Sequence, residues 1–570
     1  MIRDLMAASS TLPPERYGWS SREAALAAGV SLVAAVAVVS PFFFLGTASG
    51  HDIAFHMASW LDAAGQWRQG ILFPRWAEWP NYGYGEPRFI FYPPLSWLLG
   101  ALLGSVLPWN AVASVFIVLV ETFAGWSAYL LIRRLTDSRG ARLFGAACFA
   151  ANPYALLIVY NRSDFAELLA ISFFPLLLAG TLTLAGSLGD ENGSRRAIFA
   201  FALPFCAIWL SNAPASVIAT YTAAFLFAGV SLLDRSFWPL LRGGAGMVLG
   251  FALAAFYLIP AIYEQRWVNI AGALAHGLAP DANFLYARTA DAEHDLFNRV
   301  ASRIAVLLLA WAGLAALAVW RSKHEGRALP RARHLEPLLA TLAAVAGLLM
   351  LPLSSLAWRW LPELRFVQFP WRWMSVVALL AVVLMTRSFA GHRRWMWMLV
   401  ATLAIVGSGR YLVKHTWWDT EDMPSLEAAL GDGSGFEGTD EYDPLGDDHT
   451  DLPLKEPRAA FLPDGQADRK VFIESWTAER RSLRAITEGP ARLAVRLLDY
   501  PAWRITVNGR AVPPDHKPGS MQMIVPVGAG ESRIEIRFTR TADRVTAGVI
   551  SIVAAFGSLV AWRRQNAAGA

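Results

Sequence analysis

Twelve apolar segments, each close to the length that crosses a lipid bilayer, constrain this chain more than any other feature. A membrane-spanning helix needs about 20 largely apolar residues. Hydrophobic residues make up 55% of the 570 residues, against 17% for charged ones, and a soluble domain cannot bury that much apolar surface. The sequence therefore predicts a mainly α-helical, polytopic membrane helix bundle with about twelve spans. The segments are Ala24–Leu45, Asn110–Ile132, Ala141–Tyr160, Phe165–Gly186, Ala197–Leu210, Ala213–Leu233, Gly244–Ile262, Ile304–Trp320, Leu335–Leu353, Trp371–Met385, Trp395–Leu412 and Ala547–Trp562.

The distribution of charge predicts how the chain is oriented in the cell membrane. Residues 413–543 include 23 acidic and 16 basic residues, a net charge of −7, whereas the remainder carries +12. Basic loops between spans stay cytoplasmic, and short clusters such as Arg133-Arg134 and Arg393-Arg394 stand between apolar segments. We therefore expect both termini in the cytoplasm and residues 413–543 outside it. Clusters this short do not indicate nucleic-acid binding.

One further apolar run, Phe91–Leu107, is expected not to cross the membrane. It opens with Phe91-Tyr92-Pro93-Pro94 and is interrupted by Gly100 and Gly104. Counting it as a span would move the Arg133-Arg134 cluster to the outer side. We interpret it as a re-entrant or interfacial helix of the first outer loop, which a membrane tolerates where protein or water covers the backbone.

The acidic segment has the pattern of an extracytoplasmic β domain. Trp503–Val507 runs into Asn508-Gly509, a strong hairpin signal, and Arg533–Phe538 alternates polar and apolar residues with period two. Further strands are expected at Leu493–Leu498 and Met521–Val527. The predicted units are a transmembrane domain over 1–412, an extracytoplasmic domain over 413–543 with a β-sandwich in its second half, and a final membrane helix with a cytoplasmic tail over 544–570.

The loop after the first span holds the leading candidate for catalysis. Asp52 and His56 are four residues apart and share one face of an expected helix. A carboxylate beside ionisable and aromatic groups at a membrane surface suits a general base acting on a hydroxyl. Two alternatives stay open: Asp52 could be the N-cap of a helix over Ile53–Leu61, or it could bind a divalent metal with His51 and His56. Metal binding is the less favoured, because no third cluster of strong ligands is near in sequence.

Two other charged motifs lie at expected outer ends of spans. We expect Arg162 to pair with Asp164 or Glu167, or to contact a phosphate, while the alternative is a helix N-cap with an acidic first turn. Arg365 and Arg372 flank an aromatic stretch. The forked guanidinium group matches phosphate oxygens, so this pair predicts a lipid-linked phosphate site. Snorkelling to lipid headgroups is the alternative.

The order of these motifs resembles the GT-C class of membrane glycosyltransferases. Within that class the chain is similar to the bacterial YfhO-type membrane proteins, especially the group labelled "6-pyruvoyl-tetrahydropterin synthase-related", a label that does not imply pterin chemistry. The resemblance covers nearly the whole chain. It implies sugar transfer from a polyprenyl-phosphate donor to an acceptor on the outer side of the membrane, with Asp52 as the catalytic carboxylate. The stretches that carry it are His51-Asp52 with Phe55-His56, Phe73-Pro74-Arg75, Tyr82–Gly85, Phe91–Leu95, Arg162–Glu167, Phe369–Arg372, Gly438–Pro444, Tyr500–Trp503 and Val507–Gly509.

The leading hypothesis is therefore an inverting glycosyltransferase. Asp52 would act as base, Arg365 and Arg372 would stabilise the leaving phosphate, and His56 and Glu86 would position sugar or acceptor. The expected partners are membrane lipid, a polyprenyl-phosphate sugar donor and a glycan or lipid acceptor, and no cofactor is assigned. A transporter or lipid flippase and a non-catalytic cell-envelope scaffold are the alternatives. The candidate substrate-binding residues are His51, His56, Arg75, Glu86, Arg88, Tyr92, Arg162, Asp164, Glu167, Arg365 and Arg372.

Overall fold

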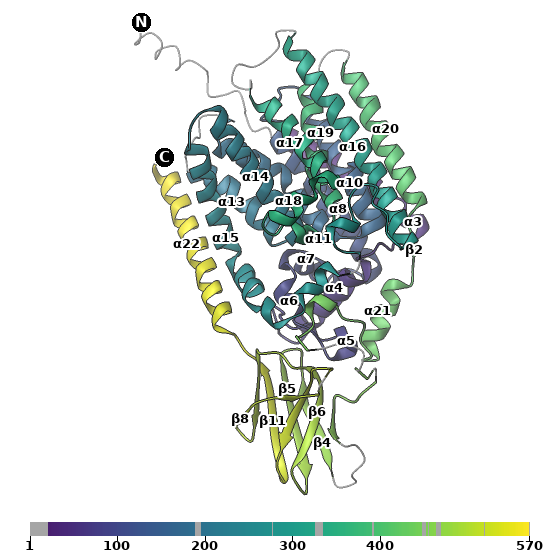
Figure 1. Ribbon diagram of the computed structural model, residues 1–570, viewed down its shortest axis with the longest axis vertical. Coiled ribbons are helices and arrows are strands. Elements are labelled where there is room, and N and C mark those ends of the chain that lie inside the picture. Colours follow the sequence, from purple (N-terminus) through teal and green to yellow (C-terminus); the bar gives the residue numbers. More distant parts are fainter. Residues whose placement is uncertain are drawn as a thin grey trace.

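Helices form one elongated bundle, and the strands form a separate unit at one end of it (Figure 1). The computed structural model describes residues 21–187, 195–275, 277–324, 334–389, 393–446, 452–453, 455–462, 469–517 and 519–568. The N-terminal segment 1–20, which the charge pattern assigns to the cytoplasm, lies outside these residues. The α-helices are α2 (Ser21–Val39), α3 (Phe42–Leu45), α4 (Ile53–Arg68), α5 (Pro80–Gly83), α6 (Arg88–Phe91), α7 (Pro94–Gly104), α8 (Trp109–Ile132), α9 (Arg139–Ala150), α10 (Pro153–Leu157), α11 (Phe165–Ser172), α12 (Phe174–Leu184), α13 (Arg195–Trp209), α14 (Ala213–Leu233), α15 (Trp238–Glu264), α16 (Ala292–His324), α17 (Leu335–Leu349), α18 (Ser355–Trp360), α19 (Met374–Arg387), α20 (Arg393–Lys414), α21 (Asp422–Gly431) and α22 (Ala542–Ala568).

Within the described residues, ten helical segments are long and apolar enough to cross a membrane. An eleventh consists of α17 and the helical stretch Pro352–Trp360, which are bent by 93° at their junction. The chain is therefore a multi-pass membrane protein. Each of the twelve predicted segments falls on a helix, but α13 has 15 residues and is shorter than a usual span. The predicted break before α14 is confirmed, because the Asn212 side chain caps that helix by accepting from the Ala215 amide at 2.9 Å.

The helix predicted not to cross is short. The helix α7 has 11 residues, which rise about 16 Å, roughly half of a bilayer core. It packs tightly on α4, because a Cβ atom added at Gly100 would lie 2.1 Å from the Trp60 ring. This contact holds the first outer loop against the bundle.

The C-terminal strands form two antiparallel sheets that share one apolar core. One sheet has the order β4-β5-β11-β7-β8 and the other β3-β6-β10-β9. The predicted hairpin is confirmed: β7 and β8 pair around Asn508 and Gly509, whose φ angles of 52° and 78° are those of the tight turns that favour these residues. The strands are β1 (Thr47–Ala48), β2 (Trp418–Asp419), β3 (Ala459–Leu462), β4 (Lys470–Trp476), β5 (Arg480–Thr487), β6 (Ala491–Leu498), β7 (Trp503–Val507), β8 (Arg510–Val512), β9 (Asp515–His516), β10 (Gln522–Val527) and β11 (Gly530–Phe538).

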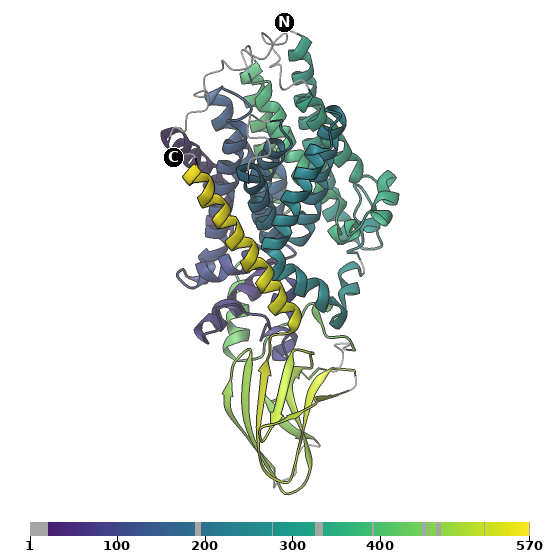
Figure 2. The same cartoon turned by 90° about the vertical axis from the view of Figure 1, so that its left-hand side faces the viewer.

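The sheet unit is joined to the bundle by buried ionic contacts. Glu264, at the end of α15, accepts hydrogen bonds from Nε and Nη2 of Arg544 at 2.6 Å each. It also accepts the hydroxyl of Tyr500 at 2.6 Å. Figure 2 shows α22 running beside α15 from this junction. The contacts tie α15, α22 and the loop between β6 and β7 together.

Candidate active site

A cavity of about 870 Å³ lies where the first outer loop meets α14, α15 and α16. Its volume is in the range of small-molecule and cofactor sites. Part of its wall is ionic, with His51, Asp52, Arg162, Asp164 and Arg372. Another part is apolar and comes from the ends of the helices α13 to α15, with Trp209, Val217, Leu258 and Ile262. A ligand that fits both parts has a charged head and an apolar tail.

Two loops that are far apart in sequence meet at the ionic wall. The Asp52 amide donates to the Arg162 carbonyl at 2.9 Å, and the Gly50 amide donates to the Ser163 hydroxyl at 3.0 Å. Gly50 permits this approach, because a Cβ there would lie 2.5 Å from the Arg162 carbonyl carbon. In the second loop, Ser163 adopts the left-handed conformation with φ of 55°. It follows the π-helical turn η1 (Ile158–Arg162). The backbone therefore brings Asp52 and Arg162 together.

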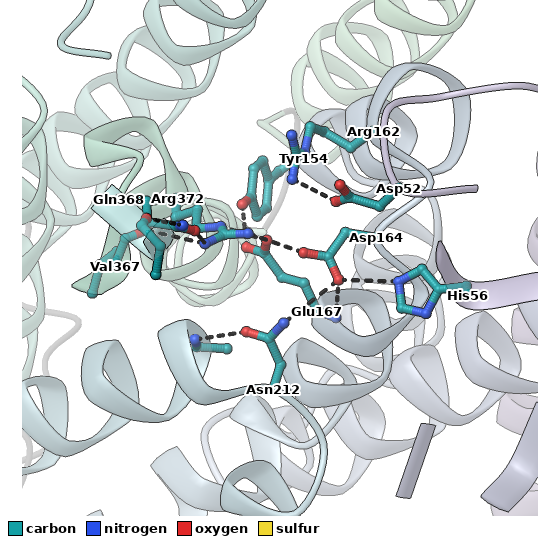
Figure 3. Close-up of polar contacts among 12 residues, drawn as sticks. Asp52, His56, Tyr154, Arg162, Asp164, Glu167, Asn212, Val367, Gln368 and Arg372 are labelled. Atoms are coloured by element: carbon teal, nitrogen blue, oxygen red, sulfur yellow. Dashed lines mark hydrogen bonds and ion pairs between the residues drawn. The ribbon is translucent and has the colours of Figure 1, made fainter. Parts of the chain in front are cut away.

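The Asp52 carboxylate points toward Arg162 and not along its own helix. It occupies the N-cap position of α4 but makes no side-chain capping hydrogen bond. Instead it accepts a hydrogen bond from Nη2 of Arg162 at 2.5 Å (Figure 3). The capping alternative is thus wrong for the side chain. About 30% of the Asp52 side chain stays exposed, at the cavity wall.

Two opposing effects act on the pKa of Asp52. Burial raises the pKa of this carboxyl above its usual value, and the Arg162 guanidinium beside it works against the shift. A carboxylate with a raised pKa is a stronger base, so this environment suits proton abstraction.

A second ionic cluster lies behind this pair. Arg372 donates through Nη2 to Asp164 at 3.0 Å and through Nε to Glu167 at 2.9 Å (Figure 3). Arg162 pairs with Asp52 instead, so its predicted pairing with Asp164 or Glu167 is wrong, while its predicted contact with a phosphate stays a prediction. The N-cap alternative for Asp164 is right, since its carboxylate accepts the Glu167 amide at 2.9 Å. Burial raises the pKa of Asp164, but the nearby His56 ring, 3.6 Å away, and the Arg372 charge more than offset this effect and hold that pKa below its usual range.

The two arginines predicted to bind phosphate do not act as a pair. Arg372 is 3% exposed, and its remaining Nη1 donates to the carbonyl of Val367 and the side chain of Gln368 at 3.0 and 3.3 Å. Arg365 is exposed, lies over the Phe366 ring and does not line the cavity. Arg365 lies within the 3₁₀ turn η7 (Leu364–Val367), and Arg372 follows that turn. The turn ends at Gln368, whose φ of 64° changes the direction of the chain between the two arginines.

Arg162 is the arginine with unused donors at the cavity. It is 7% exposed and its Nε is buried without a hydrogen-bond partner in the described part of the chain. Its guanidinium carbon lies 4.8 Å from the centre of the Phe369 ring. A buried donor of this kind favours an incoming anion, because leaving it unsatisfied is costly.

Three other predicted residues lie at or beside the cavity. His51 and Tyr92 line it, and the His51 ring contacts Phe297 edge-on at 4.8 Å. His56 is buried behind the wall, with Nε2 3.6 Å from an oxygen of Asp164. The histidine is therefore placed to orient Asp164 and not to touch a ligand directly.

Arg75, Glu86 and Arg88 do not line this cavity. Arg75 pairs with Glu479 of the sheet unit at 3.1 Å. Glu86 and Arg88 are buried and pair with each other at 2.5 Å, and Glu86 also accepts the Thr439 amide at 2.9 Å. These three residues hold the outer loop to neighbouring segments. Contrary to the prediction that they contact substrate, the structure places none of them at this cavity.

Sequence reasoning missed Glu441 and His294, which both line the cavity. Burial raises the pKa of Glu441 to about 7. The acidic stretch Gly438–Pro444 could have indicated Glu441, because it lies far from any predicted span in an acidic motif. No sequence signal marks His294. Within the residues that the structure describes, no three His, Cys, Asp or Glu side chains gather in a way that could hold a metal ion.

The chain is similar to solved structures of glycosyl-transferring enzymes. It matches the arabinofuranosyltransferase AftD from mycobacteria with a TM-score of 0.42 and 20% identity over 69% of this chain and 27% of that one. It matches the apo oligosaccharyltransferase of Archaeoglobus fulgidus with a TM-score of 0.42 and 16% identity over 70% and 56%. For the oligosaccharyltransferase AglB of the same organism, in complex with an inhibitory peptide and a dolichol-phosphate, the values are 0.41 and 13% over 74% and 61%.

The matched part spans about a quarter to three fifths of the length of those proteins. No protein-family model matches the chain, and no curated protein sequence matches it significantly.

Proposed function

We propose that this protein is a membrane glycosyltransferase that uses a lipid-phosphate-linked sugar as donor. The observation that carries the proposal is the pairing of Asp52, a carboxylate unused by its own helix, with Arg162, whose Nε is buried without a partner in the described part of the chain. Both face a cavity that also has an apolar wall. The resemblance of the ordered motifs to GT-C enzymes supports the same reaction class.

In the proposed reaction the acceptor hydroxyl lies against Asp52. As its oxygen forms a bond to the anomeric carbon, its proton passes to the carboxylate. The bond between the anomeric carbon and the phosphate oxygen breaks, and the electron pair leaves with the phosphate. The diester donor thus becomes a lipid phosphate monoester with one more negative charge. A single displacement inverts the anomeric configuration.

Arg162 takes the role that the sequence assigned to Arg365 and Arg372. Arg162 lines the cavity, and its buried Nε has no hydrogen-bond partner in the described part of the chain. Charge that develops on the leaving group is stabilised most strongly by donors already in place. Arg372 acts indirectly: it fixes Asp164 at the cavity wall and pairs with the buried Glu167.

The apolar wall suits the lipid part of the donor. Val217, Leu258 and Ile262 line the cavity, and Ile262 is 65% exposed on a helix long and apolar enough to span the membrane. The cavity is open and not filled by side chains, which favours ligand binding over the scaffold hypothesis. A chain entering there from the bilayer would stay in an apolar environment.

The test is sugar transfer by full-length protein in nanodiscs from radiolabelled short-chain polyprenyl-phosphate glucose, mannose and arabinofuranose. Asp52→Asn should lower the rate about 100-fold or more, the usual contribution of a general base. Asp281→Asn is the matched control, because its side chain is 70% exposed and does not line the cavity. Equal transfer by Asp52→Asn and wild type, at equal amounts of folded protein, would refute the role of Asp52.

A further inference from the structure

A second hollow of about 330 Å³ lies between α15, α22 and the first outer loop. Apolar side chains of α22 line it: Val545, Val549 and Ile552. All three are more than half exposed, on a helix long and apolar enough to cross the membrane. The hollow is therefore open to the side on which α22 faces lipid. Figures 1 and 2 both show α22 beside α15 along this face.

Three arginines line the same hollow, and no carboxylate does: Arg75, Arg540 and Arg544. They lie at the end of α22 nearest the sheet unit, where the helix leaves the apolar part of the structure. Glu479 pairs with Arg75 and Glu264 with Arg544, but neither glutamate lines the hollow. Asp543, next to Arg544 in sequence, also lies outside the lining.

Arg540 carries the uncompensated charge. It is exposed and makes no ion pair with any residue that the structure describes. Burial lowers the pKa of Arg75, Glu479 opposes this, and the charges of Arg544 and Arg540 add to the lowering. The three guanidinium groups therefore repel one another across the hollow, and a bound anion would relieve that repulsion.

We propose that this hollow binds an anionic glycerophospholipid of the surrounding membrane. Its phosphate would lie among the three arginines, and one acyl chain would lie in the groove along α22. Forked guanidinium groups match phosphate oxygens, and basic pockets between membrane helices attract acidic headgroups. The site goes beyond the proposed sugar transfer and does not depend on it.

Tyr257 separates this hollow from the main cavity. It lines both, and its hydroxyl donates to the Phe91 carbonyl at 2.7 Å. The lipid would thus lie directly behind one wall of the candidate active site while touching none of the charged residues there.

Native mass spectrometry of delipidated full-length protein in detergent tests the proposal. Phosphatidylglycerol should bind at one site with clearly higher affinity than phosphatidylcholine. Arg540→Gln should weaken that binding about fivefold, the effect of one arginine near a lipid headgroup. Arg510→Gln, an exposed arginine on the far hairpin of the sheet unit, should leave it unchanged.

A second variant tests the groove. A Cβ at Gly548, which lines the hollow, meets no atom within 4 Å, so Gly548→Phe starts a bulky side chain there without a clash at Cβ. It should lower phosphatidylglycerol binding while size-exclusion profiles and thermal unfolding stay normal. Retained binding in both variants would overturn the proposal.

Competing probes distinguish the source of the phosphate. Equal binding of phosphatidylglycerol and phosphatidylcholine would overturn the role of charge. Displacement of phosphatidylglycerol by millimolar inorganic phosphate would point to a free-anion site. Preference for a short polyprenyl phosphate, lost in Arg540→Gln, would assign the hollow to a donor lipid and overturn the proposal.

Discussion

The carboxylate of Asp52 lies 2.5 Å from Nη2 of Arg162, although the two residues are 110 positions apart. The contact joins the start of the first outer loop to the turn between two spans. It places a base and a phosphate-binding group side by side at one cavity wall. A substitution at either residue should therefore alter the part that the other plays in sugar transfer.

Arg162→Gln should shift the pH dependence of transfer. Arg162 lowers the pKa of Asp52, so its removal raises that pKa, and a base with a higher pKa stays protonated to a higher pH. The acidic limb of kcat/KM against pH should move to higher pH. Arg365→Gln, an exposed arginine outside the cavity, is the control. An unmoved limb in Arg162→Gln would contradict the pairing.

Glu441 should make donor binding pH-dependent near neutrality. Its pKa is raised to about 7, so the group is neutral below that pH and negative above it. A negative charge in the cavity repels the phosphodiester of the donor by about 1 kcal/mol in a partly solvated site. The KM for donor should rise severalfold between pH 6 and pH 8. Glu441→Gln should keep the low KM across this range, and a persistent rise would assign the titration to another group.

Arg372→Leu should destabilise the protein strongly. It leaves the buried Asp164 and Glu167 without their partner, and breaking a buried pair in this way costs about 3–5 kcal/mol. Arg492→Gln breaks an ion pair that is more than half exposed and should cost about 1 kcal/mol or less. Thermal unfolding of both variants in the same detergent measures the difference. Similar melting temperatures would show that the cluster is not structural.

Gly50→Ala should impair transfer without unfolding the protein. The added Cβ would lie 2.5–2.7 Å from the backbone of Arg162 and Ser163, so the two loops must separate. Misplacement by about 1 Å can lower a rate about 100-fold. Gly65→Ala is the matched control, because a Cβ added at Gly65 has no atom within 4 Å. Measured rates that fall equally in the two variants would rule out the proposed close approach.

Local patterns in the sequence were enough to predict most of the candidate spans and four of the strands, β6, β7, β10 and β11. The length of an apolar run indicates a membrane helix, and alternation of polar and apolar residues indicates a strand. Both patterns can be read from residues that are neighbours in sequence. The hairpin at Asn508 and Gly509 is confirmed for the same reason. The short helix α7 was recognised from its glycines and prolines together with the charge pattern.

The ionic contacts could not be predicted in this way. Arg162 has nearby acidic residues in sequence, yet it pairs with Asp52 because two distant loops meet through backbone hydrogen bonds. Arg365 and Arg372 are seven residues apart, and one turn with a positive φ at Gln368 leaves one exposed and the other buried. Such outcomes depend on tertiary packing.

The sheet unit begins after one membrane helix, α20, and ends at another, α22. A protease that cuts once inside it, for example at the Asn508-Gly509 turn, produces two fragments that each retain a bilayer anchor. Their strands also remain paired, since β7 is joined to β11 across the cut. Two cleavages, one on each side of the sheets, are required to shed this part of the molecule from the membrane.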